Sequence, residues 1–167
     1  NLDMAYLDVE MLAEAVRKLP HVRFHLVGSY GVHSELRKLT ENESNLVWWG
    51  RLESEIIPAV LNQVDVLLVA YKSDLYREQL SSPHKFMEYF SSGKTIVATY
   101  TDEYKDKRHL LEMVDESASF IPTLERVLKN LDIYNSEGNK AQRRDFAAEH
   151  SYPRQYEIIL ALLTRHG

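Results

Sequence analysis

An almost uninterrupted apolar run at residues 65–70, Asp-Val-Leu-Leu-Val-Ala, constrains the fold of this chain more than any other feature. Such a run is typical of a strand that is covered on both faces, as in a parallel sheet. Further short apolar runs that favour strands occur at Val22–Val27, Leu46–Trp49, Thr95–Thr99 and Ala118–Ile121. Segments of helical length separate most of these runs. The sequence therefore predicts an α/β fold, a Rossmann-like doubly wound parallel sheet with helices on both faces.

Helical patterns fill the intervals between the predicted strands. The first helix is expected to have Asp3 as its N-cap and to end at Pro20. The other predicted helices are Ser34–Thr40, Glu55–Asn62, Pro83–Ser92, Leu124–Leu131, Lys140–Glu149 and Pro153–Arg165, and residues 72–81 are predicted to form a polar loop. The 167 residues fit one domain, residues 1–167. A parallel sheet that begins with a helix also predicts a strand before Asn1, so we expect a domain truncated at its N-terminus.

Composition argues against several classes of protein. The net charge is −5, whereas proteins that bind the phosphate backbone concentrate positive charge, so no nucleic-acid partner is expected. Cysteine is absent, His21 and His25 fall at the start of a predicted strand, and the other histidines are scattered, so we expect neither a metal nor another cofactor. No apolar stretch approaches the roughly 18 residues that span a bilayer, and no signal segment is evident. A cytoplasmic location is therefore expected.

The segment from Ser81 to Thr99 contains the residues best suited to bind a ligand. Ser82 can cap a helix whose first residue is Pro83, and the free N–H groups at such an end attract an anion. Lys85 adds a mobile cation on the same helix face as Glu88, which can accept two hydrogen bonds from a vicinal diol such as a ribose. Together these groups would hold a nucleotide diphosphate. On spacing alone, the alternative is a solvated Lys–Glu pair on the surface.

This segment resembles the signature of the retaining GT-B glycosyltransferases of the "glycosyl transferases group 1", or family 4, type. The matching residues are Ser-Pro-His-Lys-Phe-Met-Glu-Tyr at 82–89, followed by Ser-Gly-Lys-Thr-Ile-Val-Ala at 92–98. Other blocks follow in the order of the family: residues 25–29 with Gly28, residues 46–52 with Gly50 and Arg51, and residues 65–72. The resemblance covers about residues 4–131 and is most specific at residues 82–98.

The resemblance implies that this is the C-terminal domain of such an enzyme, which binds a nucleotide-diphosphate sugar and transfers a hexose with retention. It implies that the segment from Ser82 through His84 to Lys85 meets the diphosphate, with Lys85 catalytic through stabilisation of the leaving group. Glu88 would bind the ribose, and Gly28 would belong to the binding loops. Arg51 and Leu52 would lie against the nucleobase; a tight turn with a solvated arginine is the alternative reading there.

One departure from the family concerns the donor sugar. A second glutamate often precedes the ribose-binding one by eight residues, and Leu80 occupies that position here. The resemblance also implies that an absent N-terminal half holds a carbohydrate or lipid-linked acceptor, supplies further basic groups, and makes any peripheral contact with the inner face of the membrane. The isolated domain is thus expected to bind the sugar donor without transferring the sugar. The full-length enzyme is expected to act in polysaccharide biosynthesis. Two alternatives remain: a sugar-nucleotide epimerase of the same fold, and a flavodoxin-like binding module without catalysis.

Overall fold

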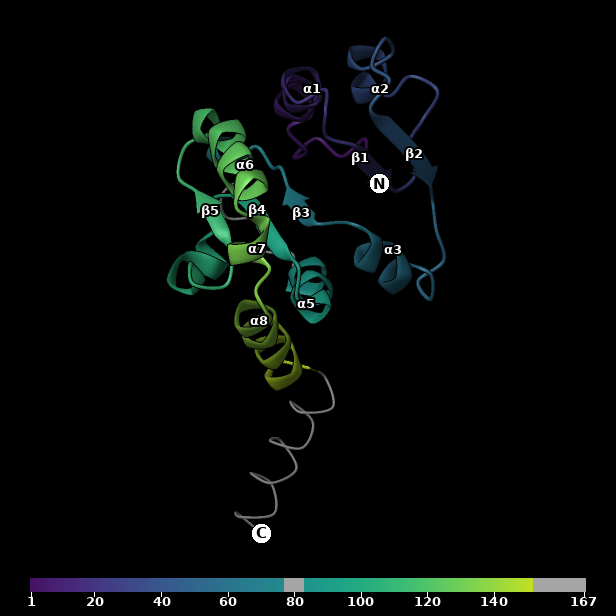
Figure 1. Cartoon of the computed structure of the whole chain (residues 1–167). Coiled ribbons are helices and arrows are strands. Elements are labelled where there is room, and N and C mark those ends of the chain that lie inside the picture. Colours follow the sequence, from purple (N-terminus) through teal and green to yellow (C-terminus); the bar gives the residue numbers. More distant parts are fainter. Residues whose placement is uncertain (77–82, 152–167) are drawn as a thin grey trace.

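The computed structural model describes residues 1–76 and 83–151 as a mixed α/β structure with parallel strands (Figure 1). One sheet pairs β1 (Phe24–Val27) with β2 (Leu46–Gly50), and a second sheet has the order β3 (Val66–Val69), β4 (Thr95–Thr99), β5 (Glu112–Val114). All of these pairings are parallel, and the register between β1 and β2 shifts after Leu26. The predicted α/β class with parallel strands is confirmed.

Strand β4 shows that the second sheet is covered on both faces. All five of its side chains are buried, and neighbouring side chains along a strand point to opposite faces. Beside this sheet lies a cluster of aromatic rings. The rings of Phe86 and Tyr104 are 4.3 Å apart between centroids, those of Phe90 and Tyr104 are 5.6 Å apart, and none of the three residues is more than 2% exposed. The largest buried side chains therefore gather on the β3–β4–β5 side of the molecule.

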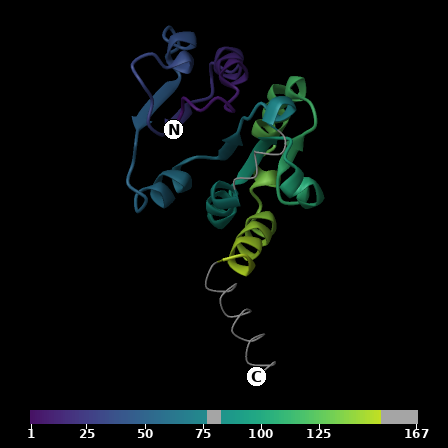
Figure 2. The same ribbon diagram turned by 180° about the vertical axis from the view of Figure 1, so that it is seen from behind.

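Helices separate the strands along the chain. Their bounds are α1 (Val9–Lys18), α2 (Glu35–Leu39), α3 (Ile57–Gln63), α4 (Ser73–Tyr76), α5 (Pro83–Ser92), α6 (Phe120–Lys129), α7 (Leu131–Tyr134) and α8 (Glu137–Glu149), with 3-10 turns η1 (Asp102–Lys107) and η2 (Ser117–Ser119). Helices α5 and α8 lie side by side in both views (Figures 1 and 2). The predicted helix Pro153–Arg165 lies outside the described residues.

Three local predictions are wrong. Asp3 does not cap α1; its Oδ2 accepts a hydrogen bond from the N–H of Gly31 at 2.5 Å, and Asp8 caps α1 by accepting one from Met11 at 3.0 Å. The run Ala118–Ile121 is no strand, because its apolar side chains belong to the turn η2 and the first turn of α6. Residues 72–81 are not a loop throughout, since Ser73–Tyr76 form α4 and residues 77–81 lie outside the description.

The segment that precedes α1 joins the two sheets at one edge. The N–H of Leu2 donates to the carbonyl of Ser29, just past the carboxyl end of β1, at 2.8 Å. Six residues later the N–H of Asp8 donates to the carbonyl of Ala70, just past the carboxyl end of β3, at 3.0 Å. Leu7 and Tyr71 also form an antiparallel bridge. Residues 1–8 therefore cross from the carboxyl end of one sheet to that of the other.

Candidate functional site

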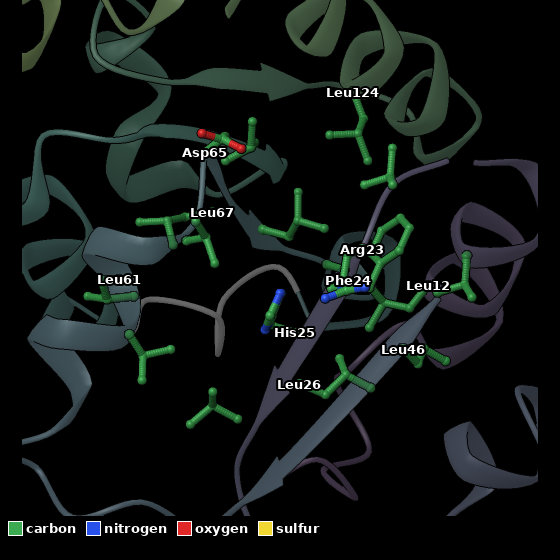
Figure 3. A pocket seen from close by; sticks show the side chains of 18 of the residues that line it. Leu12, Arg23, Phe24, His25, Leu26, Leu46, Leu61, Asp65, Leu67 and Leu124 are labelled. Atoms are coloured by element: carbon green, nitrogen blue, oxygen red, sulfur yellow. The ribbon is translucent and has the colours of Figure 1, made fainter. Parts of the chain in front are cut away.

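A cavity of about 860 Å³ opens between the two sheets. Apolar side chains of α1, β1, β3 and α6 line most of it, and Figure 3 shows Phe24 and Leu26 facing the opening across from Leu61 and Leu67. Lys85 and Glu88 of α5 line the same cavity, together with Tyr71 and Tyr89. Because parallel sheets bind ligands beyond the carboxyl ends of their strands, the part of this cavity nearest to Tyr71 is the candidate functional site.

Two tyrosine rings position the ammonium group of Lys85. Its Nζ lies 5.7 Å from the centroid of the Tyr71 ring and 5.9 Å from that of the Tyr89 ring, within the range of cation–π attraction. Burial lowers the pKa of Lys85, and the negative charge of Glu88 opposes this shift without overcoming it. Desolvation is thus the stronger effect on this ammonium, and an anion that entered the cavity would offset it.

The tyrosines beside Lys85 are held in their neutral form. Burial raises the pKa of Tyr71 to about 12 and also raises the pKa of Tyr89. Both phenols therefore remain able to donate a hydrogen bond throughout the physiological pH range. Glu88, one turn beyond Lys85 on α5, is exposed and so is accessible to hydroxyl groups of a ligand. The site combines a cation, two phenol groups and a carboxylate at one end of an apolar cavity.

The structure brings only part of the predicted site together. Lys85 and Glu88 share the cavity, whereas Arg51 and Leu52 follow β2 and do not line it. Gly28 directly follows β1 with φ of 145°, and a Cβ there would lie 3.2 Å from Cγ of Leu2, so the close approach of residues 1–2 favours glycine.

Two predictions fall at the edge of the description. Ser82 and Leu80 lie outside the described residues. Pro83 is the first residue of α5 as predicted, and His84 follows it in the helix.

Tyr71 and Tyr89 are site residues that the sequence analysis did not select. Tyr89 lies four residues after Lys85, so the helical periodicity that pairs Lys85 with Glu88 also places Tyr89 beside it. Tyr71 lies two residues after the end of β3, and no local spacing relates it to α5. Its position depends on the packing of α5 against the second sheet.

The described residues contain no cluster that could serve as a metal centre. Within residues 1–76 and 83–151, no three His, Cys, Asp or Glu side chains gather in an arrangement that could hold a metal ion. His21 and His25 are four residues apart, a spacing that places two ligands together only on a helix, but His25 lies in β1. Its Nδ1 accepts a hydrogen bond from Nε1 of Trp49 at 3.0 Å. In the same part of the chain, no helix combines the length and the apolar character needed to cross a bilayer.

Comparison with known proteins identifies the family. A family model described as glycosyl transferases group 1 matches residues 2–130. The chain belongs to this family. The matched range of this glycosyltransferase domain contains both sheets, α5 and every residue proposed above for the site.

A curated relative is consistent with this assignment. Over 151 residues the chain is 28% identical to a protein of Bacillus subtilis (strain 168) named "Putative teichuronic acid biosynthesis glycosyltransferase TuaH". The aligned region covers 84% of this chain and 36% of the relative, so the chain spans about a third of the relative's length.

Proposed function

We propose that this domain binds the nucleotide-diphosphate sugar donor of a glycosyltransferase, with the diphosphate at Lys85 and the ribose at Glu88. The observation that carries the proposal is the position of the Lys85 ammonium, which burial destabilises and which lies against two tyrosine rings in a cavity beyond β3. Within the part of the chain that is described, no carboxylate lies within ion-pair distance of this ammonium. A diphosphate would supply the missing counter-charge.

The orientation of α5 supports the same arrangement. The amino-terminal end of an α-helix has N–H groups without partners within the helix and the positive end of the helix dipole, and in α5 this end begins at Pro83. Lys85 lies in the first turn, and Glu88 lies one turn further from that end. A ligand with its phosphates at the helix end and its ribose one turn along would meet both side chains. Pro83, His84 and Ser82 are the proposed diphosphate contacts at that end, and Lys85 is the group proposed to stabilise the leaving diphosphate.

The transfer reaction is part of the proposal. We propose that polypeptide outside residues 1–167 holds a carbohydrate or lipid-linked acceptor, and that the hexose is transferred with retention. Arg51, Leu52 and Gly28 are proposed to border the nucleotide, although none of the three lines the cavity. The name of the Bacillus subtilis relative supports a role in polysaccharide biosynthesis.

Binding of UDP, GDP, ADP and CMP, measured by calorimetry and thermal shift, tests the donor site. For whichever nucleotide binds, Lys85→Met should weaken binding of the nucleoside diphosphate by about 1.5–3 kcal/mol, the value of a charge-assisted hydrogen bond. The same substitution should leave binding of the nucleoside unchanged. Glu88→Gln should weaken binding of the nucleotide that carries ribose and should not affect binding of the corresponding dideoxynucleotide. Lys38→Met on α2, an exposed lysine away from the cavity, is the matched control. Equal losses for the nucleoside and the diphosphate with Lys85→Met would contradict the assignment.

A further inference from the structure

Three separate segments of the chain meet at Tyr71, beside the candidate site. Residues 6–8 pair with residues 70–72 in antiparallel fashion, β4 contributes Thr99, and α5 contributes Lys85. Tyr71 itself is buried among them. The way in which Tyr71 is held therefore bears on where the ammonium group of Lys85 lies.

Hydrogen bonds fix the backbone around Tyr71 from two sides. The N–H of Tyr71 donates to Oγ1 of Thr99 at 2.9 Å on the side of β4. On the side of residues 6–8, the N–H of Lys72 donates to the carbonyl of Tyr6 at 2.8 Å. These bonds secure the peptide groups, but they leave the orientation of the Tyr71 ring to contacts between side chains.

Tyr6 supplies such a contact. Its ring lies 5.1 Å from the ring of Tyr71 between centroids, at an interplanar angle of 84°. Edge-to-face pairs of this kind are directional, because the positive edge of one ring is attracted to the negative face of the other. The attraction of a cation is directional as well, since it acts over the face of a ring. Rotation of the Tyr71 ring away from Tyr6 would therefore also change the face that it presents to Lys85.

The second ring beside Lys85 has no comparable dependence on another segment. Tyr89 follows Lys85 by four residues on α5, so the geometry of the helix itself places the two side chains together. Tyr71 lies outside α5, and the distance of 5.7 Å between its ring centroid and Nζ of Lys85 depends on how separate segments pack. Of the two cation–π contacts, the contact with Tyr71 is thus the one that a neighbouring residue can control.

We propose that Tyr6 is a positioning residue of the donor site, which acts through the ring of Tyr71 on the ammonium group of Lys85. The inference rests on the proposed function, because it gives Tyr6 a part in binding the diphosphate. Tyr6 does not line the cavity itself. Its effect on a ligand therefore passes through Tyr71, which keeps the positive charge of Lys85 in one place.

Nuclear magnetic resonance of the ligand-free full chain provides a test that needs no nucleotide. The Hε protons of Lys85 should resonate upfield of those of exposed lysines, because their ammonium lies over two aromatic rings and ring currents shift such protons upfield. Tyr6→Leu should remove up to about half of this shift, since the two rings lie at nearly equal distances from Nζ. Tyr6→Phe keeps the ring and should preserve the shift. An unchanged shift in Tyr6→Leu, or in Tyr6→Met if the leucine variant does not fold, would overturn the proposal.

Calorimetry with whichever of UDP, GDP and ADP binds the unsubstituted protein provides the second test. Tyr6→Leu should weaken binding about three- to tenfold, the equivalent of one edge-to-face contact, and Tyr6→Phe should retain most of the affinity. Because Tyr6 acts through the ammonium group, Tyr6→Leu should have no further effect in a protein that already carries Lys85→Met. Additive losses in that double variant would show that Tyr6 acts on the fold in general, and they would overturn the proposal.

Tyr30→Leu is the matched control. Tyr30 is also a half-buried tyrosine that packs against an aromatic ring, with 4.9 Å between its centroid and that of Trp48, and the guanidinium of Arg37 lies over its face. Tyr30 does not line the cavity, so its loss should change neither the Lys85 signal nor the affinity. Equal effects of Tyr30→Leu and Tyr6→Leu would overturn the proposal.

The two proposals can fail separately. If no nucleotide binds the unsubstituted protein, the proposed function fails, and the Lys85 signal still decides whether Tyr6 positions the ammonium group. If nucleotide binds and Lys85→Met weakens binding, but Tyr6→Leu changes neither the Lys85 signal nor the affinity, the role of Tyr6 fails and the donor site stands.

Discussion

The two sheets of this domain differ sharply in how well they are covered. In the β3–β4–β5 sheet every side chain of the middle strand is buried, whereas β1 buries only Phe24 and none of the five residues of β2 is fully buried. Each sheet is nevertheless joined to its helices by an asparagine. Nδ2 of Asn45, just before β2, donates to the carbonyls of Val16 in α1 and of its C-cap Leu19 at 3.1 Å each, and Nδ2 of Asn135, just after α7, donates to the carbonyl of Asp65, just before β3, at 2.8 Å. The difference therefore lies in the cover of the strands and not in the connections at their ends.

Helix α8 explains much of the difference between the two sheets. Helix α8 lies beside α5 and contributes Arg143, which is 4% exposed. Its Nε donates to the carbonyl of Leu110 at 2.9 Å, and its Nη1 donates to those of Gly93 and Tyr134 at 3.0 Å each. Among the described residues, no buried arginine donates hydrogen bonds to β1 or β2 in this way. The open side of their sheet faces the cavity. The β3–β4–β5 sheet is therefore the more fully buried of the two, and β1 borders the cavity.

The largest contrast should appear on removing a core side chain from each side. Phe90→Ala should lower the free energy of unfolding by about 3–5 kcal/mol, because the ring is fully buried against Tyr104 and Phe146. In residues 1–167, Leu26→Ala should cost about 1 kcal/mol, because part of that side chain already faces the cavity. Urea denaturation of the two variants measures both values. Similar losses would show that the two sheets are equally well covered.

Arg143→Met comes next in size. It leaves buried carbonyl groups without donors, so we expect a loss of about 2–4 kcal/mol in the free energy of unfolding. Arg126→Met is the control: that guanidinium donates to Oε2 of Glu112 at 2.6 Å but its side chain is 56% exposed, so its loss should stay below about 1 kcal/mol. If Arg143→Met were as mild as the control, α8 would not be what secures the β3–β4–β5 sheet.

The fold class could be read from the sequence because buried parallel strands leave apolar runs. Val66–Val69 and Thr95–Thr99 are such runs, and the structure places strands there. β5 was missed because its three residues, Glu112–Val114, are too few to show a period. The run at Ala118–Ile121 was misassigned because Phe120 and Ile121 begin an apolar helix face that continues beyond the run. Short elements are decided by the surrounding packing rather than by their own pattern.

The candidate site was predictable where its residues share one helix. Spacing on α5 placed Lys85 and Glu88 on one face, and both line the cavity. Tyr71 could not be found in that way, because its distance from Lys85 depends on how β3 and α5 pack. The N-cap of α1 was misjudged for a related reason: Asp3 and Asp8 are equally able to cap, and the path of residues 1–8 between the sheets decides which one does so.

The protonation state of Lys85 should make nucleotide binding depend on pH. Burial holds its pKa below the usual 10.5, and a bound diphosphate favours the charged form. Affinity for a nucleoside diphosphate should therefore fall as pH rises through the lowered pKa, by up to about tenfold per unit, with a proton taken up on binding. Calorimetry in buffers of different ionisation enthalpy measures this uptake. Lys85→Met should abolish the dependence, and Lys38→Met on the exposed α2 should retain it.

Without ligand, the stability of the fold should change with pH in the opposite direction to the affinity for the ligand. The unfolded chain holds the Lys85 proton at pH values where the folded protein has released it, so the free energy of unfolding should rise as pH increases from the lowered pKa toward 10.5. Lys85→Met should thus stabilise the unliganded protein or leave its stability unchanged while weakening binding. A marked loss of stability would mean that the ammonium supports the fold, against its proposed role.

The smallest contrast compares two glycines of similar backbone conformation. Gly50, at the end of β2, has φ of 69°, and Gly93, after α5, has φ of 78°. In Gly50→Ala the new Cβ meets no atom within 4 Å, so the loss should be the left-handed backbone cost alone, roughly 1 kcal/mol. In Gly93→Ala the Cβ would lie 2.9 Å from Nε of Arg144 and 3.2 Å from the backbone oxygen of Lys140. We expect about 1 kcal/mol of additional loss in urea denaturation, because α8 must shift.

The double variant Gly93→Ala with Arg144→Ala separates the two contacts behind that additional loss. Removing the Arg144 side chain relieves the shorter contact, but the Lys140 backbone oxygen remains at 3.2 Å. Part of the extra cost should therefore persist, measured against Arg144→Ala alone. Complete recovery would show that only a flexible side chain opposes the new methyl group. Equal losses for the Gly50 and Gly93 single variants would show that α8 can move away from Gly93 without cost, and the proposed contrast between the two sheets would then rest on their strands alone.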